Sequence, residues 1–557
     1  MKTWIAVVAS LQRTCEGGFR TCAAGLLVTL LCGCNGNDGT DEVAKAPTAM
    51  VIDIVELSAA DAQAKMARGE FTARQLTQAY LDRIAAIDRA GPALNSVIEL
   101  NSAALDDAAV LDAERASGHI RGPLHGIGLL LKDNIDVAGM VNSAGSLALE
   151  NNRPKQDAFL VARLRAAGAI ILGKTNLSEL ANFRSTHSTS GWSSRGGQTR
   201  NPYVLDRNPC GSSAGTASAI AASLATIGVG TETDGSIICP AAINGLVGLK
   251  PTVGAVSRHG IIPISSSQDT AGPMGRTVAD VAVLLSALVA ADDGNAANDP
   301  TKAHPGPDFT AFLNAGALAG KRLGVARKSL GFNADVDAAM ERAIAALTAA
   351  GAIVIDVKIE GYGSWDAAEL DVMLFEFKDG LNAYLKAAGI TPASLAELID
   401  WNDAHRDRVM PWFGQELLLM AQAKGSLKDP EYIEARSRAR RLAGADGLLA
   451  TLTANRIDAL IAPSNGPAWV TDVVLGDRSG GGGGAGIAAV AGTPSITVPM
   501  GNAHGLPLGL VFMGPADSEA QLIGFAFAFE QATHARTPPK FLPTLPTTPQ
   551  RAVDAHR

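Results

Sequence analysis

The chain of 557 residues is long enough for one large domain or for several small ones. Hydrophobic residues make up 47% of it and charged residues only 18%, which excludes a disordered chain. There are 47 basic and 55 acidic residues, so the formal net charge is −8. Because no long basic run occurs either, nucleic acid is not an expected partner.

Residues 1–34 are predicted to be a signal peptide of the lipoprotein type. Basic residues precede the apolar run CAAGLLVTLLCG, which is too short to span a bilayer and has the length of a signal-peptide core. The following LLCGCN resembles the lipobox of bacterial lipoproteins and would make Cys34 the lipid-modified residue. Residues 35–57 follow as a linker. We expect an exported protein, periplasmic or anchored to the cell envelope, that meets a membrane only through Cys34. A misassigned start codon is the alternative.

Four of the six cysteines lie in that leader, which leaves Cys210 and Cys239 in the body of the chain. Two cysteines do not form a disulfide framework, so both are predicted to be small buried residues. The nine histidines are scattered and no H-E-x-x-H occurs, so no metal site is predicted.

Hydrophobic periodicity predicts alternating helices and strands in the first half of the chain. Helices are expected over 76–87 and 102–116, and a buried aliphatic strand within 124–137. Residues 157–176 read as a helix, a glycine stop and a strand, and residues 212–236 as a small-residue helix leading to a further strand. Such alternation predicts an α/β fold with a mainly parallel or mixed sheet that has helices on both faces.

The second half continues this pattern and adds a helical region. A strand at 320–327 precedes a helix and strand within 337–359. A largely helical section covers 365–452, a strand follows at 457–464, and a hairpin-like pair of strands is expected within 495–514.

The domain organisation follows from these elements. We predict a single domain over residues 58–540, with a helical insertion at about 364–455 and a tail at 541–557. No internal repeat is visible.

Two catalytic motifs match by letter but not by context. GAIILGKT at 168–175 fits the P-loop pattern, yet its central residues read as a strand rather than as a loop around phosphates. GSSAG at 211–215 fits the nucleophile elbow with Ser213 as nucleophile. That motif needs an aliphatic strand before the serine, and the preceding segment is polar and broken by proline.

A lysine and two serines can supply acyl-transfer chemistry without histidine. Ser236 follows TETDG, a tight turn whose backbone N–H groups could face a developing oxyanion. Lys132 ends an aliphatic strand, and a lysine acts as a base only when burial keeps it neutral. Asp133 follows directly, but neighbouring strand side chains point to opposite faces, so Asp133 need not hold Lys132 charged. A solvent-exposed Lys132 is the alternative.

Five segments together resemble the amidase signature family: LLLKDNI, GKTNLSE, CGSSAG, GTETDGSI and GLKPTVG. The resemblance extends from about Ser58 to near Thr537. It implies a serine–cis-serine–lysine triad, in which Ser236 is the nucleophile, Ser212 relays the proton from a cis peptide bond, and Lys132 is the base. The resemblance assigns the oxyanion and substrate-binding positions to the backbone amides of Thr233, Asp234, Gly235 and Ser236. Ser213 is expected to support the site.

Two departures from the family pattern bear on the substrate. Many members carry two glycines before the nucleophile, whereas here Asp234 precedes Gly235. Several relatives carry an arginine two or three residues after the nucleophile, in some of them to bind an acidic substrate, and this chain has Ile238 and Cys239 there. A dicarboxylate, a malonate amide or a glutaminyl-tRNA role is therefore not expected.

Further runs, among them GGQTRNPY, GIIPIS, QDTAGPM and FGQELL, are similar to those of bacterial peptide amidases, which remove the C-terminal amide of peptides. The resemblance implies a peptide amide or another small amide as substrate, an acyl-enzyme on Ser236, ammonia as product, and no cofactor or metal. Aryl acylamides, fatty acid amides and cyclic oligoamides stay open as substrates, as does a lipoprotein that only binds peptides. The sequence does not indicate the oligomeric state and is compatible with a monomer.

Overall fold

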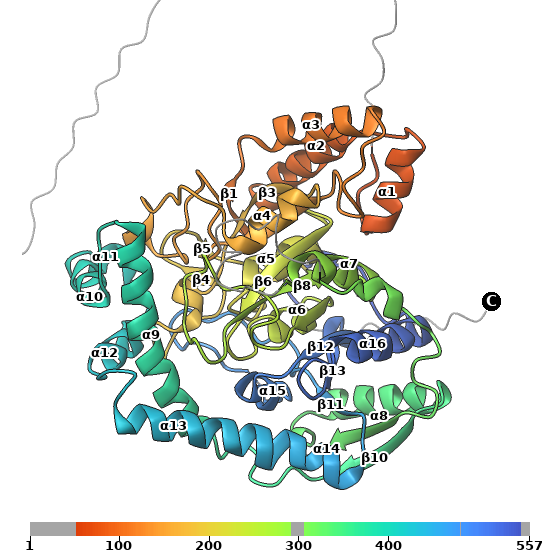
Figure 1. Ribbon diagram of the computed structural model, residues 1–557, viewed down its shortest axis with the longest axis vertical. Coiled ribbons are helices and arrows are strands. Elements are labelled where there is room, and N and C mark those ends of the chain that lie inside the picture. The colour runs from red at the N-terminus through yellow and green to blue at the C-terminus, as the bar shows by residue number, and fades with distance from the viewer. Residues whose placement is uncertain (1–51, 291–305, 480, 547–557) are drawn as a thin grey trace, which may run out of the picture. The chain divides into compact units, whose positions relative to one another are not determined.

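The computed structural model describes most of the chain, namely residues 52–290, 306–479 and 481–546 (Figure 1). Three predicted segments lie wholly or mostly outside the described residues: the signal peptide 1–34 with Cys34, the linker 35–57 and the tail 541–557. The limits of the predicted single domain, 58–540, stay a prediction.

An 11-stranded mixed sheet runs through the fold in the order β1-β3-β2-β6-β8-β7-β12-β13-β11-β9-β10. Its strands are β1 (Val97–Leu100), β2 (Gly128–Lys132), β3 (Ile170–Thr175), β6 (Ile227–Glu232), β7 (Val247–Lys250), β8 (Thr270–Gly275), β9 (Arg322–Ala326), β10 (Ile353–Val357), β11 (Ala459–Pro463), β12 (Ser495–Ala503) and β13 (Leu506–Met513). β3, β2 and β6 are parallel, as are β11, β9 and β10, and the other neighbouring pairs are antiparallel. Two short strands, β4 (Trp192–Ser193) and β5 (Gly197–Gln198), pair separately.

Helices surround this sheet (Figure 1). Those that accompany its strands are α1 (Ala59–Ala67), α2 (Ala73–Arg83), α3 (Ala104–Ala116), α4 (Phe159–Ala166), α5 (Ala214–Ala221), α6 (Ile238–Ile243), α7 (Val278–Leu288), α8 (Ala334–Ala349), α15 (Gly486–Ala491) and α16 (Glu519–Thr533). The predicted helical section contains α9 (Asp366–Ala388), α10 (Leu395–Ala404), α11 (Arg406–Val409), α12 (Glu416–Gln422), α13 (Pro430–Arg440) and α14 (Ala450–Asn455). α9 packs against α13, which continues through a π-helical segment at Arg441–Leu449 into α14.

The predicted fold class, an α/β fold with a large mixed sheet flanked by helices, is confirmed. Sequence patterns did not reveal the central strand β8, whose residues TAGPMG include two glycines and a proline. β8 lies between β6 and β7, where a side chain on Gly272 would meet the carbonyl oxygen of Leu249 at 2.2 Å. Close backbone packing therefore requires glycine in a strand that propensity alone disfavours.

Three neighbouring parallel strands end at the same edge of the sheet. Lys132 is the last residue of β2, Thr175 of β3 and Glu232 of β6. Because parallel strands bring their carboxyl ends together, the loops that follow them are close in space although far apart in sequence. The candidate active site lies at this edge.

Candidate active site

Lys132 ends β2 with its side chain fully buried, so the alternative of a solvent-exposed lysine is wrong. Its Nζ lies 2.8 Å from Ser212 Oγ, 2.9 Å from Thr231 Oγ1 and 3.0 Å from the Thr231 carbonyl oxygen. A neutral amine has two protons and one lone pair. It can donate to the two Thr231 oxygens and accept from the hydroxyl of Ser212, so all three contacts are compatible with an uncharged Lys132.

The surroundings of Lys132 favour that uncharged form. Burial lowers the pKa of Lys132 to about 7, and the more distant carboxylates of Asp269 and Glu232 oppose the shift. Among the residues described, no carboxylate lies within ion-pair distance of its amine. A large fraction of Lys132 is therefore neutral near pH 7, as a base requires.

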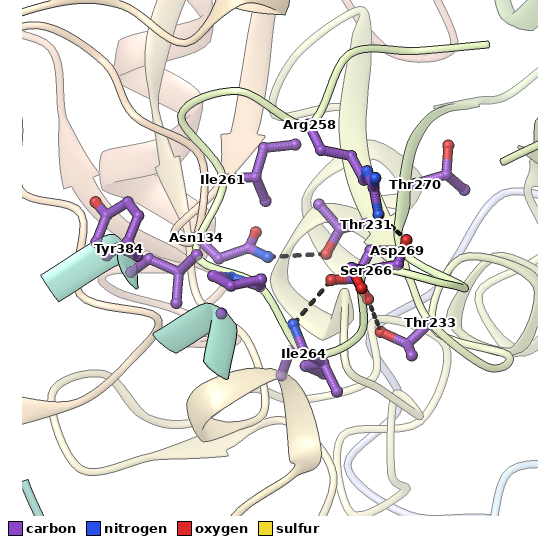
Figure 2. A pocket seen from close by; sticks show the side chains of 14 residues that line it. Asn134, Thr231, Thr233, Arg258, Ile261, Ile264, Ser266, Asp269, Thr270 and Tyr384 are labelled. Carbon is purple, nitrogen blue, oxygen red and sulfur yellow. Dashed lines mark hydrogen bonds between the residues drawn. The ribbon is translucent and has the colours of Figure 1, made fainter. Parts of the chain in front are cut away.

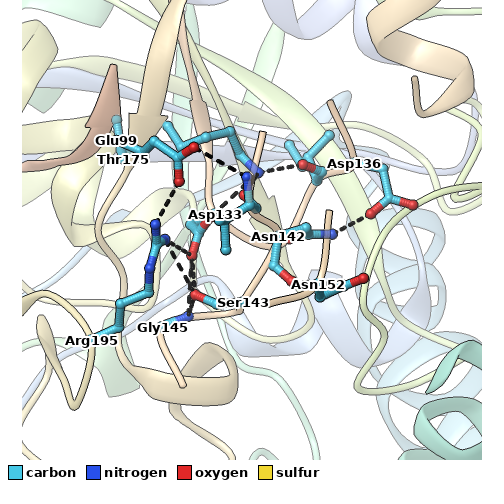
Figure 3. A network of polar contacts seen from close by, with 12 residues as sticks. Glu99, Asp133, Asp136, Asn142, Ser143, Gly145, Asn152, Thr175 and Arg195 are labelled. Atoms are coloured by element: carbon cyan, nitrogen blue, oxygen red, sulfur yellow. Dashed lines mark hydrogen bonds and ion pairs between the residues drawn. The ribbon is translucent and has the colours of Figure 1, made fainter. Parts of the chain in front are cut away.

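Asp133, the next residue along the chain, is paired elsewhere (Figure 3). Its carboxylate lies 3.4 Å from Lys174 Nζ and 3.3 Å from Arg195 Nη1, and it also accepts a hydrogen bond from Ser143. Lys174 itself is fully buried and donates to the carbonyl oxygen of Ile135 at 2.6 Å. Asp133 thus serves a second buried lysine and leaves Lys132 without an anionic partner.

The same lysine excludes the P-loop interpretation of residues 168–175. Ile170–Thr175 form β3, and all six of these residues are buried within the sheet. Lys174 is held by Asp133 and by backbone carbonyls rather than facing an open phosphate loop.

The two serines before α5 have different partners. Ser212, preceded by a cis peptide bond from Gly211, contacts Lys132 through its hydroxyl, and its carbonyl oxygen accepts from the backbone N–H of Ser178. Ser213 Oγ instead donates to the carbonyl oxygen of Thr231 at 3.1 Å and accepts from its N–H at 3.2 Å. Ser213 therefore links α5 to β6, which favours a structural role over that of an elbow nucleophile.

Ser236 lies in the turn between β6 and α6 and is 8% exposed. Gly235 before it has φ of +74°, a conformation that glycine adopts without strain. The backbone N–H groups of residues 233–236 donate to no acceptor within the described part of the chain. Four consecutive free donors beside a serine are the arrangement that an oxyanion hole needs. Ser236 Oγ likewise has no hydrogen-bond partner among the described residues.

The carboxylate of Glu232 binds the two residues that follow Ser236. Its Oε2 accepts from the backbone N–H groups of Ile237 and Ile238, at 2.7 and 2.9 Å, where α6 begins. These two donors are thereby satisfied, while those of the preceding four residues stay available. The carboxylate of Glu232 is 1% exposed and fixes where the turn leaves β6.

Cys210 and Cys239 form a disulfide, which corrects the prediction of two separate buried cysteines. Cys210 precedes the Ser212 turn, and Cys239 follows Ser236 in α6. Their Cα atoms lie 6.0 Å apart although 29 residues separate them in sequence. Because the pairing depends on how the two turns pack, the number of cysteines could not reveal it. The bond joins the two serine-bearing turns covalently.

A cleft of about 390 Å³ opens beside these turns. Its wall includes Cys210 and Gly211 from one turn, Asp234 and Gly235 from the other, and glycines of the run at 481–486. The cleft exposes two carboxylates, Asp234 and Asp477, whereas no lysine or arginine side chain is found among the described residues that line it. Small side chains and free backbone donors make it suitable for a neutral amide.

A second cavity of about 260 Å³ lies beside the end of β6 (Figure 2). Apolar residues 261–264 form much of its wall. Asn134 donates to Thr231 Oγ1 at 3.0 Å, and Thr233 Oγ1 donates to Asp269 at 2.6 Å. Thr231 and Thr233 line this cavity, whereas Asp234 and Gly235 line the first cleft, so the end of β6 and the turn after it border both.

Sequence reasoning named Lys132, Ser212 and Ser236 but missed the residues that surround them. Thr231 supplies two of the three oxygens around Lys132, and it lies within the GTETDGSI segment that was singled out for Ser236. Asp269 lies within QDTAGPM and anchors the turn through Thr233. Both residues lie within segments noted in the sequence, but their contacts with Lys132 and Thr233 could be found only from the structure.

The described residues contain no group of three or more histidine, cysteine, aspartate or glutamate side chains that could hold a metal ion. No helix in the described ranges is long and apolar enough to cross a membrane.

The amidase family model matches residues 75–523 of this chain. The chain belongs to the amidase signature family. As an amidase it is similar to the crystal structure of native peptide amidase from Stenotrophomonas maltophilia, with 54% identity, a TM-score of 0.83, and coverage of 88% of this chain and 99% of that one.

Two curated relatives are named for different activities. A probable amidase of Arabidopsis thaliana is 39% identical over 502 residues, covering 88% of this chain and 92% of the relative. A glutamyl-tRNA(Gln) amidotransferase chain of Salinispora arenicola is 36% identical over 515 residues, covering 87% of this chain and 99% of the relative. The family therefore includes members named for different activities, and the substrate has to be argued from the site.

Proposed function

We propose that this amidase hydrolyses the C-terminal amide of peptides to a free acid and ammonia through an acyl-enzyme on Ser236. The observation that carries the proposal is the 2.8 Å contact between fully buried Lys132 and Ser212, next to a turn with four free backbone donors. The 54% identity to a peptide amidase supports peptide amides over other amide substrates. A cleft without basic side chains among its described lining residues also suits a neutral C-terminus.

In acylation the neutral amine of Lys132 accepts the proton of Ser212 while Ser212 accepts that of Ser236. The oxygen of Ser236 bonds to the amide carbon, and the carbonyl electron pair moves onto its oxygen. N–H groups of residues 233–236 donate to this oxyanion, and one such donor is typically worth about 100- to 1,000-fold in rate. The approach of Ser236 Oγ to Ser212 Oγ is part of the proposal, because such contacts often form only with substrate bound.

Collapse of the tetrahedral intermediate breaks the carbon–nitrogen bond. The proton held by Lys132 passes back through Ser212 to the leaving nitrogen, which departs as ammonia. Water then attacks the ester on Ser236 and gives up its proton along the same path, which releases the acid and restores the serine. No proton is gained or lost by the protein over the cycle.

The test is a peptide with a C-terminal amide incubated with purified protein, with ammonia release and product mass followed together. We expect conversion of amide to acid with every internal bond intact, and its loss in Ser236→Ala. Ser213→Ala is the matched control, since among the described residues the hydroxyl that it removes bonds only to backbone atoms of Thr231, and the backbone contact of Ser213 with Ser236 is kept, so it should retain activity. Activity in Ser236→Ala, with none in Ser213→Ala, would contradict the assignment.

The location of the protein is a separate proposal, export with lipid attachment at Cys34, and it rests on the leader sequence. Mass spectrometry of the protein from its own membrane fraction should find a diacylglyceryl group on Cys34 and no residues before it. An intact unmodified leader would refute it.

A further inference from the structure

We infer that Asp234 is a specificity-determining residue, whose carboxylate binds a positive charge on the residue that carries the scissile amide. The inference deepens the proposed function and rests on it. Substrates such as lysine-type amides, or amides with a free α-ammonium group, would be preferred over neutral ones of the same size.

Asp234 lies in the right place for such a contact. It comes two residues before Ser236, and two residues span at most about 7 Å of chain. Its side chain is accessible and lines the same cleft as Gly235 and Gly211, the neighbours of the two serines. A carbonyl bound at Ser236 therefore lies within about 7 Å of chain from the residue that carries this carboxylate.

The carboxylate of Asp234 has no partner in the described part of the protein. It makes no hydrogen bond and no ion pair there, whereas Asp477 in the same cleft and the buried Glu232 both accept hydrogen bonds. A side chain on Gly486 would lie 3.4 Å from its Oδ1, so the absence of one keeps the carboxylate uncovered on that side. An accessible, unpaired carboxylate beside a nucleophile is free to bind a group of the substrate.

Nearby charges make a cation the favoured occupant. Carboxyl groups of Glu232 on β6 and of Asp366 and Glu369 on α9 interact with Asp234, and Lys250 on β7 is the basic group that opposes them. Desolvation within the cleft and the repulsion from Glu232 and Asp366 raise the pKa of Asp234 to about 7. A substrate cation would relieve this repulsion and keep Asp234 ionised, whereas an anionic product is repelled.

Asp477 provides the matched control, because it is a carboxylate in the same cleft whose oxygens are already occupied. It accepts from the backbone N–H of Ser190 at 3.0 Å, from Ser190 Oγ at 2.5 Å and from Trp469 Nε1 at 3.2 Å. Replacing it removes the same formal charge from the cleft but not a free binding group.

The experiment compares kcat/KM within two pairs of amides. In the first pair N-acetyl-lysine amide is cationic and N-acetyl-norleucine amide is neutral. In the second pair norleucine amide is cationic and its N-acetyl form is neutral. We expect the wild type to prefer at least one cationic partner by about three- to tenfold, as for a partly desolvated charge pair. In Asp234→Asn and Asp234→Gly the lysine-to-norleucine ratio should fall to about one, and the second ratio should shift toward the acetylated amide. In Asp477→Asn both ratios should persist. Because ratios are compared, a loss common to both substrates cancels.

The possible failures can be told apart. A wild-type ratio near one for both pairs, or a ratio unchanged in both Asp234 variants, would overturn the role of Asp234 while peptide amide hydrolysis stands. If the wild type hydrolyses neither amide, although a serine-reactive probe still labels Ser236, the proposed function fails and this inference fails with it. High ionic strength should weaken a genuine preference, since salt screens the charge pair.

Discussion

Two fully buried lysines end or nearly end neighbouring parallel strands, and they differ in what surrounds their amines. Lys132 on β2 contacts hydroxyl and carbonyl oxygens of Ser212 and Thr231, whereas Lys174 on β3 lies 3.4 Å from the carboxylate of Asp133. In the parallel pairing of β2 with β3, Lys174 lies opposite Leu131, the residue before Lys132. The two lysines are therefore offset by one residue along neighbouring strands.

Burial lowers the pKa of both lysines, and the carboxyl groups decide how far each stays charged. For Lys174 the opposing groups are Asp133, Asp136 and Glu99, and the first of these is an ion-pair partner. For Lys132 the opposing Asp269 and Glu232 act only from a distance. Lys132 can stay neutral and act as a base because Lys174, and not Lys132, forms the ion pair with the nearby carboxylate of Asp133. We therefore assign proton transfer to Lys132 and structural support to Lys174.

Replacing Lys132 with Met should have the largest effect on activity. Methionine fills a similar volume but cannot accept a proton, so kcat/KM for a peptide amide should fall by about 10²- to 10⁴-fold. The protein should stay folded, because the residue removed is held as a neutral group. Steady-state ammonia release and circular dichroism check the two parts. Wild-type turnover by a folded Lys132→Met would remove this lysine from the mechanism.

Replacing Lys174 with Met should act mainly on stability. Asp133 would then lose a buried partner, and breaking such a pair typically costs about 3–5 kcal/mol. Urea denaturation at pH 7 should therefore show a clearly lower free energy of unfolding than for Lys132→Met. Turnover per active site, counted with a serine-reactive probe, should change far less.

The double variant Lys174→Met with Asp133→Asn is the control for this comparison. Removing both charges eliminates a buried carboxylate that would otherwise keep only Arg195 as its ion-pair partner, so part of the stability should return. A Lys174→Met protein as stable as the wild type would show that this pair does not support the fold.

Sequence motifs singled out Lys132, Ser212 and Ser236, which lie in short segments that resemble the family, and the structure brings the first two into contact. The surroundings of these groups were not predictable in the same way. That Asp133 faces Lys174 depends on β2 and β3 being neighbours, and β3 lies about 40 residues further along the chain. The alternation of side chains along a strand predicted that Asp133 and Lys132 point to opposite faces. It did not predict that the partner of Asp133 is Lys174.

The fold was predictable where hydrophobic periodicity was clean, as in β2, β3 and the hairpin of β12 and β13. It was not predictable at β8, where backbone packing requires Gly272, nor at the disulfide, where two turns meet. Both depend on contacts between distant segments, and no local pattern encodes them.

The pH dependence of kcat/KM should reflect the protonation of the Lys132 amine. The neutral amine is the active form, and its fraction falls about tenfold for each pH unit below its pKa. Since burial places the pKa of Lys132 at about 7, kcat/KM for an uncharged peptide amide should decline with decreasing pH below about pH 7. We call this decline below about pH 7 the acidic limb of the pH profile. The residual kcat/KM of Lys132→Met should show no acidic limb. The same limb in both proteins would mean that a group other than Lys132 causes it.

Replacing Asp269 with Asn should give the smallest effect, a shift of that limb to lower pH by less than about one unit. Asp269 is the first of the two carboxylates that oppose the lowering of the Lys132 pKa, so neutralising it makes Lys132 easier to deprotonate. The amide can still accept from the backbone N–H groups of Ile264 and Ser265 and donate to Thr233, so the local bonds can survive. Asp136→Asn is the matched control, because Asp136 opposes the pKa shift of Lys174 instead, and it should leave the limb in place. Equal shifts in the two variants would show that the lysines are not electrostatically separate.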